Sequence, residues 1–258
     1  MPLRKSAKTK LLDAAVDVIR AKGYSATTVD DICQSAGVTK GAFFHHFESK
    51  EVLAVSAARH FSSLAERLFS TVPYRELADP VDRLLGYLEF RKALLRGELP
   101  EFTCLLGTMV QEAYRTHPAI REACEKCLSE HVAMLELDIA EALRTYGGDR
   151  QWSAESLAIY MQAVIQGAFI LAKAQRGPAV AVVCLDHLRR YIQTLFGHPK
   201  KGKQHDRQDD RNSSTSGHRR AQRSGAGIRT GITSNLSRYG SDASVPHERS
   251  TSGDRPGS

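Results

Sequence analysis

The segment from Thr27 to Lys50, TTVDDICQSAGVTKGAFFHHFESK, constrains the fold of this chain more than any other. Thr28 precedes Asp31 by three residues, which is the spacing of a capping box and predicts the start of a helix. Apolar residues then recur at the i, i+3, i+4 and i+7 positions of one helical face: Val29, Ile32, Cys33 and Ala36. Gly37 predicts the helix end, because glycine adopts positive φ at little cost.

A second short helix is predicted directly after this turn. Thr39 is a suitable N-cap for it, and Phe43 and Phe47, four residues apart, would share its inward face. The residues left pointing outward are Lys40, Gly41, Phe44 and His45. This arrangement is a helix-turn-helix, in which the second helix presents its N-terminal residues to the major groove of DNA.

These residues closely resemble the signature of the tetracycline-repressor (TetR) family of bacterial regulators. The matching run is AGVTKGAFFHHF from Ala36 to Phe47, followed by Ser49, Lys50, Glu51 and Leu53. Roughly fifteen matched positions in order form a much more specific signal than a short motif. Cys33 stands where the family usually has Ala, and Phe44 where it usually has a Tyr that hydrogen-bonds a DNA phosphate. Beyond about the first fifty residues, only the helical layout is similar.

The helix-turn-helix predicts a set of DNA-contacting residues for a double-stranded operator. We expect Thr39, Lys40 and Gly41 to approach base edges, with Gly41 allowing close approach. The side chains expected to hold phosphates, which set register more than sequence, are Thr28, His45, His46 and Lys50, with Phe44 on the same surface.

A first helix over residues 6–22 is predicted to pack behind the helix-turn-helix and to end at Gly23. Together these three helices would form a DNA-binding domain over residues 1–50. Arg4, Lys5 and Lys8 are well placed for backbone phosphates, although a solvated basic terminus would carry the same residues.

The charge of the chain is concentrated at its two ends. Residues 1–50 carry 8 Lys or Arg against 5 Asp or Glu, residues 51–197 carry 16 against 18, and residues 198–258 carry 12 against 6. This distribution favours a polyanionic partner that meets the ends. Five cysteines, an odd number, indicate reduced cytoplasmic thiols rather than a disulfide framework. We expect neither a signal peptide nor a membrane span.

The central part of the chain predicts an all-α fold, with residues 51–197 as a helical ligand-binding and dimerisation domain. Helices are expected at 49–71, 80–96, 101–115, 118–146, 153–175 and 179–196, separated by Gly and Pro. The last two are the most apolar, along Leu157, Met161, Val164, Ala168 and Leu171 on one and Leu185, Leu188, Ile192 and Leu195 on the other. Such a pair either fills the core or faces a second copy. The family resemblance implies a homodimer through a four-helix seam made by these two helices of each subunit.

Two kinds of chemistry remain open within this domain. No catalytic motif with suitable spacing is present, so we expect neither an enzyme nor a bound cofactor. Cys124, Cys127 and His131 fall on one helical face, with Cys104 on a neighbouring helix. These residues could be core residues, a thiol sensor or a metal site, and the latter two would give a regulator that responds to oxidant or metal.

A small-molecule effector is the leading alternative to thiol or metal sensing. Candidate lining residues combine apolar walls with a few polar anchors: Tyr87, Arg91, Cys104, Met109, Tyr114, Met134, Tyr160, Gln166 and Phe169. Taken singly, a residue of this kind is more often an ordinary core residue than a ligand contact. After Gly197 the composition becomes polar, and residues 198–258 are expected to form a disordered basic tail. The expected function is a ligand-responsive repressor that binds a palindromic operator as a dimer.

Overall fold

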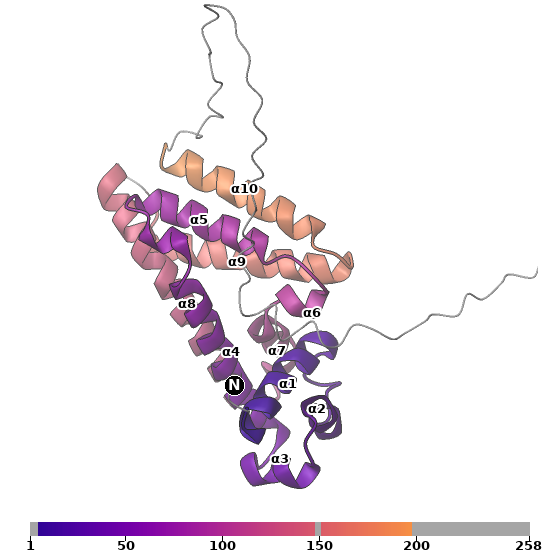
Figure 1. Ribbon diagram of the computed structural model, residues 1–258. Helices are drawn as coiled ribbons and strands as arrows, with labels where there is room; N and C mark the ends of the chain where they lie inside the picture. Colours follow the sequence, from indigo (N-terminus) through magenta and orange to yellow (C-terminus); the bar gives the residue numbers. More distant parts are fainter. Residues whose placement is uncertain (1–4, 148–150, 198–258) are drawn as a thin grey trace, which may run out of the picture. The chain divides into compact units, whose positions relative to one another are not determined.

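The computed structural model describes residues 5–147 and 151–197, which fall within one compact unit. All regular elements in these two ranges are helical, which confirms the predicted all-α fold. They are α1 (Ala7–Lys22), α2 (Val29–Ala36), α3 (Lys40–His46), α4 (Lys50–Ser70), the 3₁₀ helix η1 (Pro73–Glu76), α5 (Pro80–Ala93), α6 (Leu99–Phe102), α7 (Leu105–Ala113), α8 (Pro118–Tyr146), α9 (Ala154–Ala174) and α10 (Ala179–Leu195). We call α1–α3 the head and α4–α10 the body (Figure 1).

The helix boundaries predicted around the turn are confirmed by their capping bonds. Thr28 and Asp31 form a reciprocal capping box at the start of α2, and Gly37 ends that helix in the left-handed conformation with φ 62°. The hydroxyl of Thr39 accepts a bond from the Ala42 N–H at the start of α3. These interactions satisfy backbone groups that a short helix leaves free.

The prediction of a single helix over residues 101–115 is wrong. Thr103 and Cys104 interrupt it and separate α6 from α7. Both residues have extended backbone conformations. The Thr103 carbonyl accepts a 2.7 Å bond from Nε of Arg20 in α1 instead of a bond from within its own helix. This bond joins residues 83 positions apart in sequence, so no local pattern could have indicated it.

Two apolar cores lie within the unit, and their boundary does not follow the domain boundary predicted at residue 50. The first core contains residues of all three head helices together with Leu53, Ala57, Leu105, Met109, Ile120, Cys124 and others from α4, α7 and α8. The second contains Phe69, Leu84, Leu135, Ile139, Met161, Leu188 and others from α4, α5, α8, α9 and α10. The head is therefore packed into the body and does not close a core of its own.

Helices α4 and α8 connect these two cores. Leu53 of α4 and Cys124 of α8 lie in the first core, whereas Phe69 of α4 and Leu135 of α8 lie in the second. The two helices pack against each other between the head and the layer formed by α5, α9 and α10 (Figure 1). A displacement within the second core therefore has a direct mechanical path to the head.

The prediction that these residues of α9 and α10 form the dimer seam is largely wrong, because most of them fill the core of their own subunit. Leu188 is 3% exposed and Ile192 is fully buried. The same burial applies to Leu157, Met161, Ala168 and Leu185, while Val164 and Leu195 are half-buried. Among the predicted residues only Leu171 is exposed. Periodicity detects an apolar stripe, but it does not say which of two stripes meets the protein's own core.

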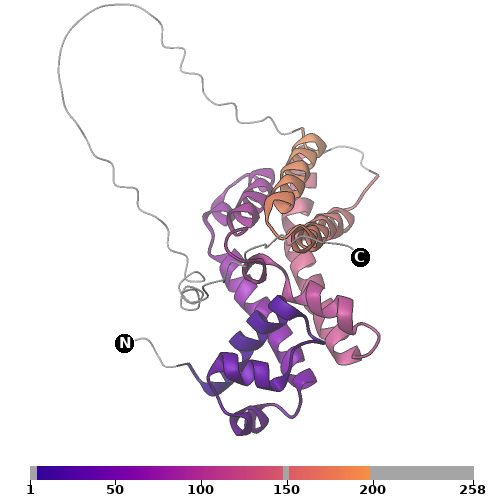
Figure 2. The same ribbon diagram turned by 90° about the vertical axis from the view of Figure 1, so that its right-hand side faces the viewer.

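A second apolar face on α9 and α10 is exposed to solvent in the single subunit. Its large members are Ile159, Tyr160, Ile170, Leu171, Val183 and Tyr191. The rings of Tyr160 and Tyr191 pack edge-to-face across the two helices, with centroids 5.4 Å apart. Figure 2 shows these two helices, in pink and orange, from a second direction.

The expectation that no stretch approaches a membrane span needs correction for α9. Its 21 residues reach a mean hydropathy of 1.5 over an 18-residue window, which is enough by length and composition. The helix packs against α8 and α10, and 44% of that window is buried. The predicted tail over residues 198–258 and the predicted phosphate contact Arg4 lie outside the described residues.

Candidate DNA-binding surface and ligand cavity

The outward face of α3 is the candidate DNA-binding surface. Phe43 and Phe47 are buried in the first core, as predicted, whereas Phe44 is 53% exposed. The Phe43 ring contacts both of the others, with centroids 5.1 Å from Phe44 and 6.0 Å from Phe47. Two buried rings therefore anchor a helix of only seven residues and fix which side faces outward.

The N-terminus of α3 carries exposed polar groups. The ammonium of Lys40 lies 3.0 Å from Oδ1 of Asp30 in α2, and both side chains are largely exposed. Gly41 is exposed and has only the Thr39 hydroxyl within 4 Å of where a Cβ would stand. Thr39, Lys40 and Gly41 thus lie together at one helix end, accessible to a ligand as large as DNA.

The residues predicted to hold phosphates divide into two groups. His45 and His46 lie at the end of α3 with ring centroids 4.9 Å apart, and His45 is exposed. By contrast, the N–H and hydroxyl of Thr28 both donate to Oδ2 of Asp31, each at 2.8 Å. A hydrogen bond from Lys22, followed by those from Thr28, lowers the pKa of Asp31 to about 2. The donors of Thr28 therefore serve the capping box.

Lys50 has a structural role that its sequence position did not reveal. Its ammonium donates to the carbonyl oxygens of Thr27 at 2.8 Å and Tyr24 at 3.0 Å. It also lies 4.3 Å from the centre of the Tyr24 ring. The partners are 23 and 26 residues away, so no local pattern could have indicated them. Lys50 holds the α1–α2 connection against the start of α4.

The head is fixed to the body by polar contacts as well as by the shared core. The Ser25 N–H donates to Oε2 of Glu112 at 2.8 Å, which ties the end of α1 to α7. Nε2 of His60 in α4 lies 2.8 Å from Oδ1 of Asp13 in α1. Together with the bond from Arg20 to the Thr103 carbonyl, these contacts attach α1 to α4, α6 and α7.

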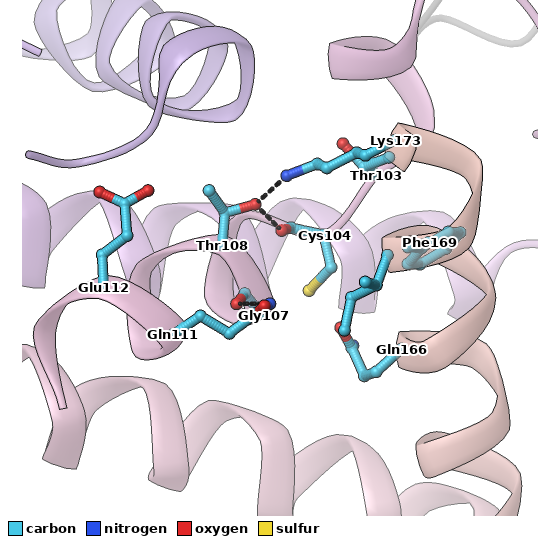
Figure 3. Close-up of a pocket in the computed structure, with 10 residues that line it drawn as sticks. Thr103, Cys104, Gly107, Thr108, Gln111, Glu112, Gln166, Phe169 and Lys173 are labelled. Carbon is cyan, nitrogen blue, oxygen red and sulfur yellow. Dashed lines mark hydrogen bonds between the residues drawn. The ribbon is translucent and has the colours of Figure 1, made fainter. Parts of the chain in front are cut away.

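A cavity of about 190 Å³ opens between α7 and α9 (Figure 3). Its lining residues are Thr103, Cys104, Gly107, Thr108, Gln111, Glu112, Gln166, Phe169, Ile170 and Lys173. Of the nine predicted ligand contacts, Cys104, Gln166 and Phe169 line it. Cys104 packs against both apolar cores, so the cavity lies where the two cores meet.

Polar groups within this cavity are arranged around Thr108. The Lys173 ammonium donates to the Thr108 hydroxyl at 2.6 Å, and that hydroxyl donates to the Cys104 carbonyl at 2.9 Å (Figure 3). Burial lowers the pKa of Lys173. The amide oxygen of Gln166 lies close to Gly107, next to where a Cβ would stand. Lys173 was not predicted, because a single Lys near a helix end usually lies in solvent.

Four other predicted ligand contacts lie outside this cavity. Tyr114 and Tyr160 are exposed on the surface, and Met109 is buried in the first core. Met134 packs half-buried against the second core. Helical periodicity predicts the elements but does not specify the packing that brings their side chains together.

Tyr87, Arg91 and His131 form a separate buried polar cluster. The Arg91 guanidinium donates to the Tyr87 hydroxyl and to Nε2 of His131, both at 2.9 Å. It also stacks 4.5 Å from the centre of the Phe69 ring. Burial, followed by repulsion from Arg91, lowers the pKa of His131 to about 3. His131 is therefore neutral at physiological pH and accepts these bonds through Nε2.

The proposed sensing set of Cys104, Cys124, Cys127 and His131 does not converge. Cys124 and Cys127 are buried in the first core, whereas His131 faces Arg91. Burial raises the pKa of Cys124 to about 12 and also raises that of Cys127, so both stay protonated and unreactive. Across residues 5–147 and 151–197, no group of three His, Cys, Asp or Glu could hold a metal ion. Cys124 and Cys127 are core residues.

Comparison with known protein families gives two matches that together span the head and most of the body. Residues 11–57 match the family model described as bacterial regulatory proteins, tetR family. Residues 80–180 match the model described as transcriptional regulator LmrA/YxaF-like, C-terminal domain. The second match covers the elements that line the cavity.

Similar proteins include two repressors and many solved structures. The transcriptional repressor DhaR of Mycobacterium sp. (strain GP1) is 28% identical over 173 residues, covering 67% of this chain and 85% of that protein. The repressor KstR2 of Rhodococcus jostii is 43% identical over 54 residues, which is 21% of this chain and 26% of KstR2. The regulatory protein TetR from Rhodobacter sphaeroides superposes with a TM-score of 0.64 at 22% identity, covering 72% of this chain and 98% of that one. The last similarity concerns the fold alone.

Proposed function

The chain belongs to the TetR family of bacterial regulatory proteins and is a DNA-binding transcriptional regulator, and from this we propose that it is a ligand-responsive repressor that binds a palindromic operator as a homodimer. The observation that carries the proposal is the exposed N-terminus of α3, held in place by two buried rings. Operator binding would place the protein in the cytoplasm.

Thr39, Lys40 and Gly41 are proposed to read base edges, because they occupy the accessible end of α3. Lys40 would exchange its ion pair with Asp30 for an acceptor on a base. His45 and His46, together with the exposed ring of Phe44, would lie along the phosphate backbone. Thr28 and Lys50 would support this surface from behind, since their donors are directed into the protein.

The dimer would form through the exposed apolar face of α9 and α10. Single apolar side chains are common on protein surfaces, but six large ones on one face of a helix pair form a patch, and such patches mark interaction sites. A second copy would cover them by a two-fold, self-complementary contact. The same symmetry would place two α3 helices one turn of DNA apart, roughly 34–36 Å.

The effector is proposed to bind in the cavity between α7 and α9. Thr103 and Glu112 line this cavity and also hold Arg20 and Ser25 of the head. A molecule that displaces these two residues would shift α1, and with it the separation of the two α3 helices. The operator would then be released because only one separation fits its half-sites.

Selection of bound sequences from random duplex DNA by the full-length chain tests this function. We expect enrichment of an inverted repeat whose half-sites are centred about one helical turn apart. Footprinting on the selected site should protect both half-sites at once. Binding of equal strength to every duplex, with no enriched sequence, would contradict the proposal.

A further inference from the structure

We propose that the cavity between α7 and α9 binds a small organic carboxylate, with Lys173 as the partner of its negative charge. The inference rests on the proposed function, since it names the chemical class of the effector. Phe169 and Ile170 would form the apolar wall for the rest of the molecule.

The charge of Lys173 lacks the counter-ion that comparable side chains in this protein have. Lys92 is also half-buried, and its ammonium lies 2.6 Å from Asp186 and 3.7 Å from Glu89. Lys173 is half-buried on α9 and bonds the neutral hydroxyl of Thr108, with no carboxylate within ion-pair distance in the described part of the chain. An ammonium has three donors, so two remain available for an anion. A carboxylate here would form charge-assisted bonds, the stronger class of hydrogen bond.

The two charged residues of the cavity differ in how well they are already satisfied. The carboxylate of Glu112 accepts the Ser25 N–H from the head and lies apart from Lys173, with Thr108 between them (Figure 3). A cationic ligand would meet a carboxylate that is exposed to water and already accepts one N–H, where an ion pair is worth little. An anionic ligand meets a half-buried cation with free donors. The observations therefore favour the anion.

The dimensions of the cavity limit the occupant to a small molecule. Its volume of about 190 Å³ equals the space of roughly six water molecules. A single ring or a short alkyl chain that carries one carboxylate has about this size. Ile170 also belongs to the exposed apolar face of α9, so the partner subunit would narrow the mouth of the cavity.

Occupation of this site would reach the head through a short series of contacts. A carboxylate bonded to the two free donors would shift the Lys173 ammonium relative to Thr108, whose hydroxyl also bonds the Cys104 carbonyl at the break between α6 and α7. The adjacent Thr103 carbonyl holds Arg20 of α1. A shift at the break therefore moves a residue that positions the head.

Titration calorimetry on the full-length dimer, with benzoate and hexanoate as probes and benzamide as the neutral counterpart of benzoate, tests the proposal. We expect at least one carboxylate to bind at millimolar concentrations, with benzamide binding about tenfold more weakly or not at all. Lys173→Met should weaken carboxylate binding by about 10- to 100-fold, because it removes a bond to a charged group. Lys126→Met, at an exposed lysine of α8, is the matched control and should bind as the wild type does.

Each remaining outcome is decisive. Absence of binding by both carboxylates, equal binding of benzamide, or unchanged binding by Lys173→Met would each overturn the inference. Lys173→Arg, which keeps the charge, should retain most of the affinity and shows that loss in Lys173→Met is not misfolding. Operator binding without any probe is measured in parallel. If it is intact while the probes fail, the inference alone is wrong, and if it is absent, the proposed function is wrong.

Discussion

The backbone N–H of Ser25 donates a 2.8 Å hydrogen bond to Oε2 of Glu112, although the two residues are 87 positions apart in sequence. This bond joins the turn after α1 to α7, next to Gly23, where a Cβ would collide with the Glu112 carboxylate. This bond is one of several contacts between the head and the body, and it depends on the Glu112 side chain. That side chain also lines the cavity.

Glu112→Ala should loosen this contact without unfolding the head. The Ser25 N–H would lose its acceptor, and we expect its hydrogen exchange to accelerate by about tenfold or more. Amide exchange followed by NMR measures this directly. Glu122→Ala, at an exposed residue of α8 paired with its neighbour Arg121, is the control and should leave Ser25 unchanged. Equal exchange in both variants would mean that another group protects the amide.

Lys40→Ala should weaken operator binding and relax the preference at one base position. The expected cost is about 1–3 kcal/mol if the ammonium contacts a base edge. Binding to the selected operator and to its single-base variants, compared with the wild type, checks this. Lys126→Ala serves as a charge-matched control. A uniform loss across all sequences would instead indicate a phosphate contact.

Lys50→Met should lower the stability of the protein rather than the salt dependence of DNA binding. The carbonyls of Tyr24 and Thr27 would lose their donor, at a cost of about 1–3 kcal/mol in the free energy of unfolding. Urea unfolding measures the first quantity, and operator affinity at several salt concentrations measures the second. An unchanged stability with a salt slope reduced by about one would show that Lys50 binds a phosphate.

Two arginine substitutions on α10 should have different effects. Val183 is 54% exposed on the proposed seam, so Val183→Arg should give a folded monomer with weak operator binding. Leu188 is 3% exposed within the second core, so Leu188→Arg should disrupt folding, because it buries an unpaired charge. Light scattering and circular dichroism distinguish these results. A dimeric Val183→Arg protein would show that the seam lies elsewhere.

His131 should make the protein less stable in mild acid. Burial and the neighbouring Arg91 lower its pKa to about 3 in the folded state, whereas an unfolded His titrates near 6.5. Below about pH 6.5 the unfolded state therefore binds more protons than the folded state. The free energy of unfolding falls as the pH falls through about 6.5 toward 3. Between pH 7 and pH 5 the protonation of His131 lowers the free energy of unfolding by about 2 kcal/mol.

Comparison of the wild type with His131→Gln isolates this effect, because Gln keeps an acceptor for Arg91 but does not titrate. We expect the fall in unfolding free energy between pH 7 and pH 5 to be smaller in this variant by about the same amount. His187→Gln, at an exposed residue of α10, should leave the fall nearly unchanged. If the wild type and His131→Gln lose equal stability, the pKa of His131 in the folded protein lies near its unfolded value and not near 3.

The helix-turn-helix could be predicted from the sequence because its signals are local. The capping box of Thr28 and Asp31, the positive φ of Gly37 and the spacing of Phe43 and Phe47 each involve residues within four positions of one another. Such signals act within one or two turns of helix, so the order of the residues is enough to recognise them. The same reasoning gave most helix boundaries and failed at Thr103, where a distant arginine intervenes.

What the sequence alone determined is therefore most of the helices and the helix-turn-helix near the N-terminus. Only the tertiary structure decided which stripe of α9 and α10 fills the core, where the ammonium of Lys50 points, and that Lys173 enters a cavity. These features arise from contacts between residues far apart in sequence, whose geometry no periodicity specifies. An apolar stripe is equally apolar against its own core or a second copy, and only packing against α5 and α8 showed which stripe was already buried.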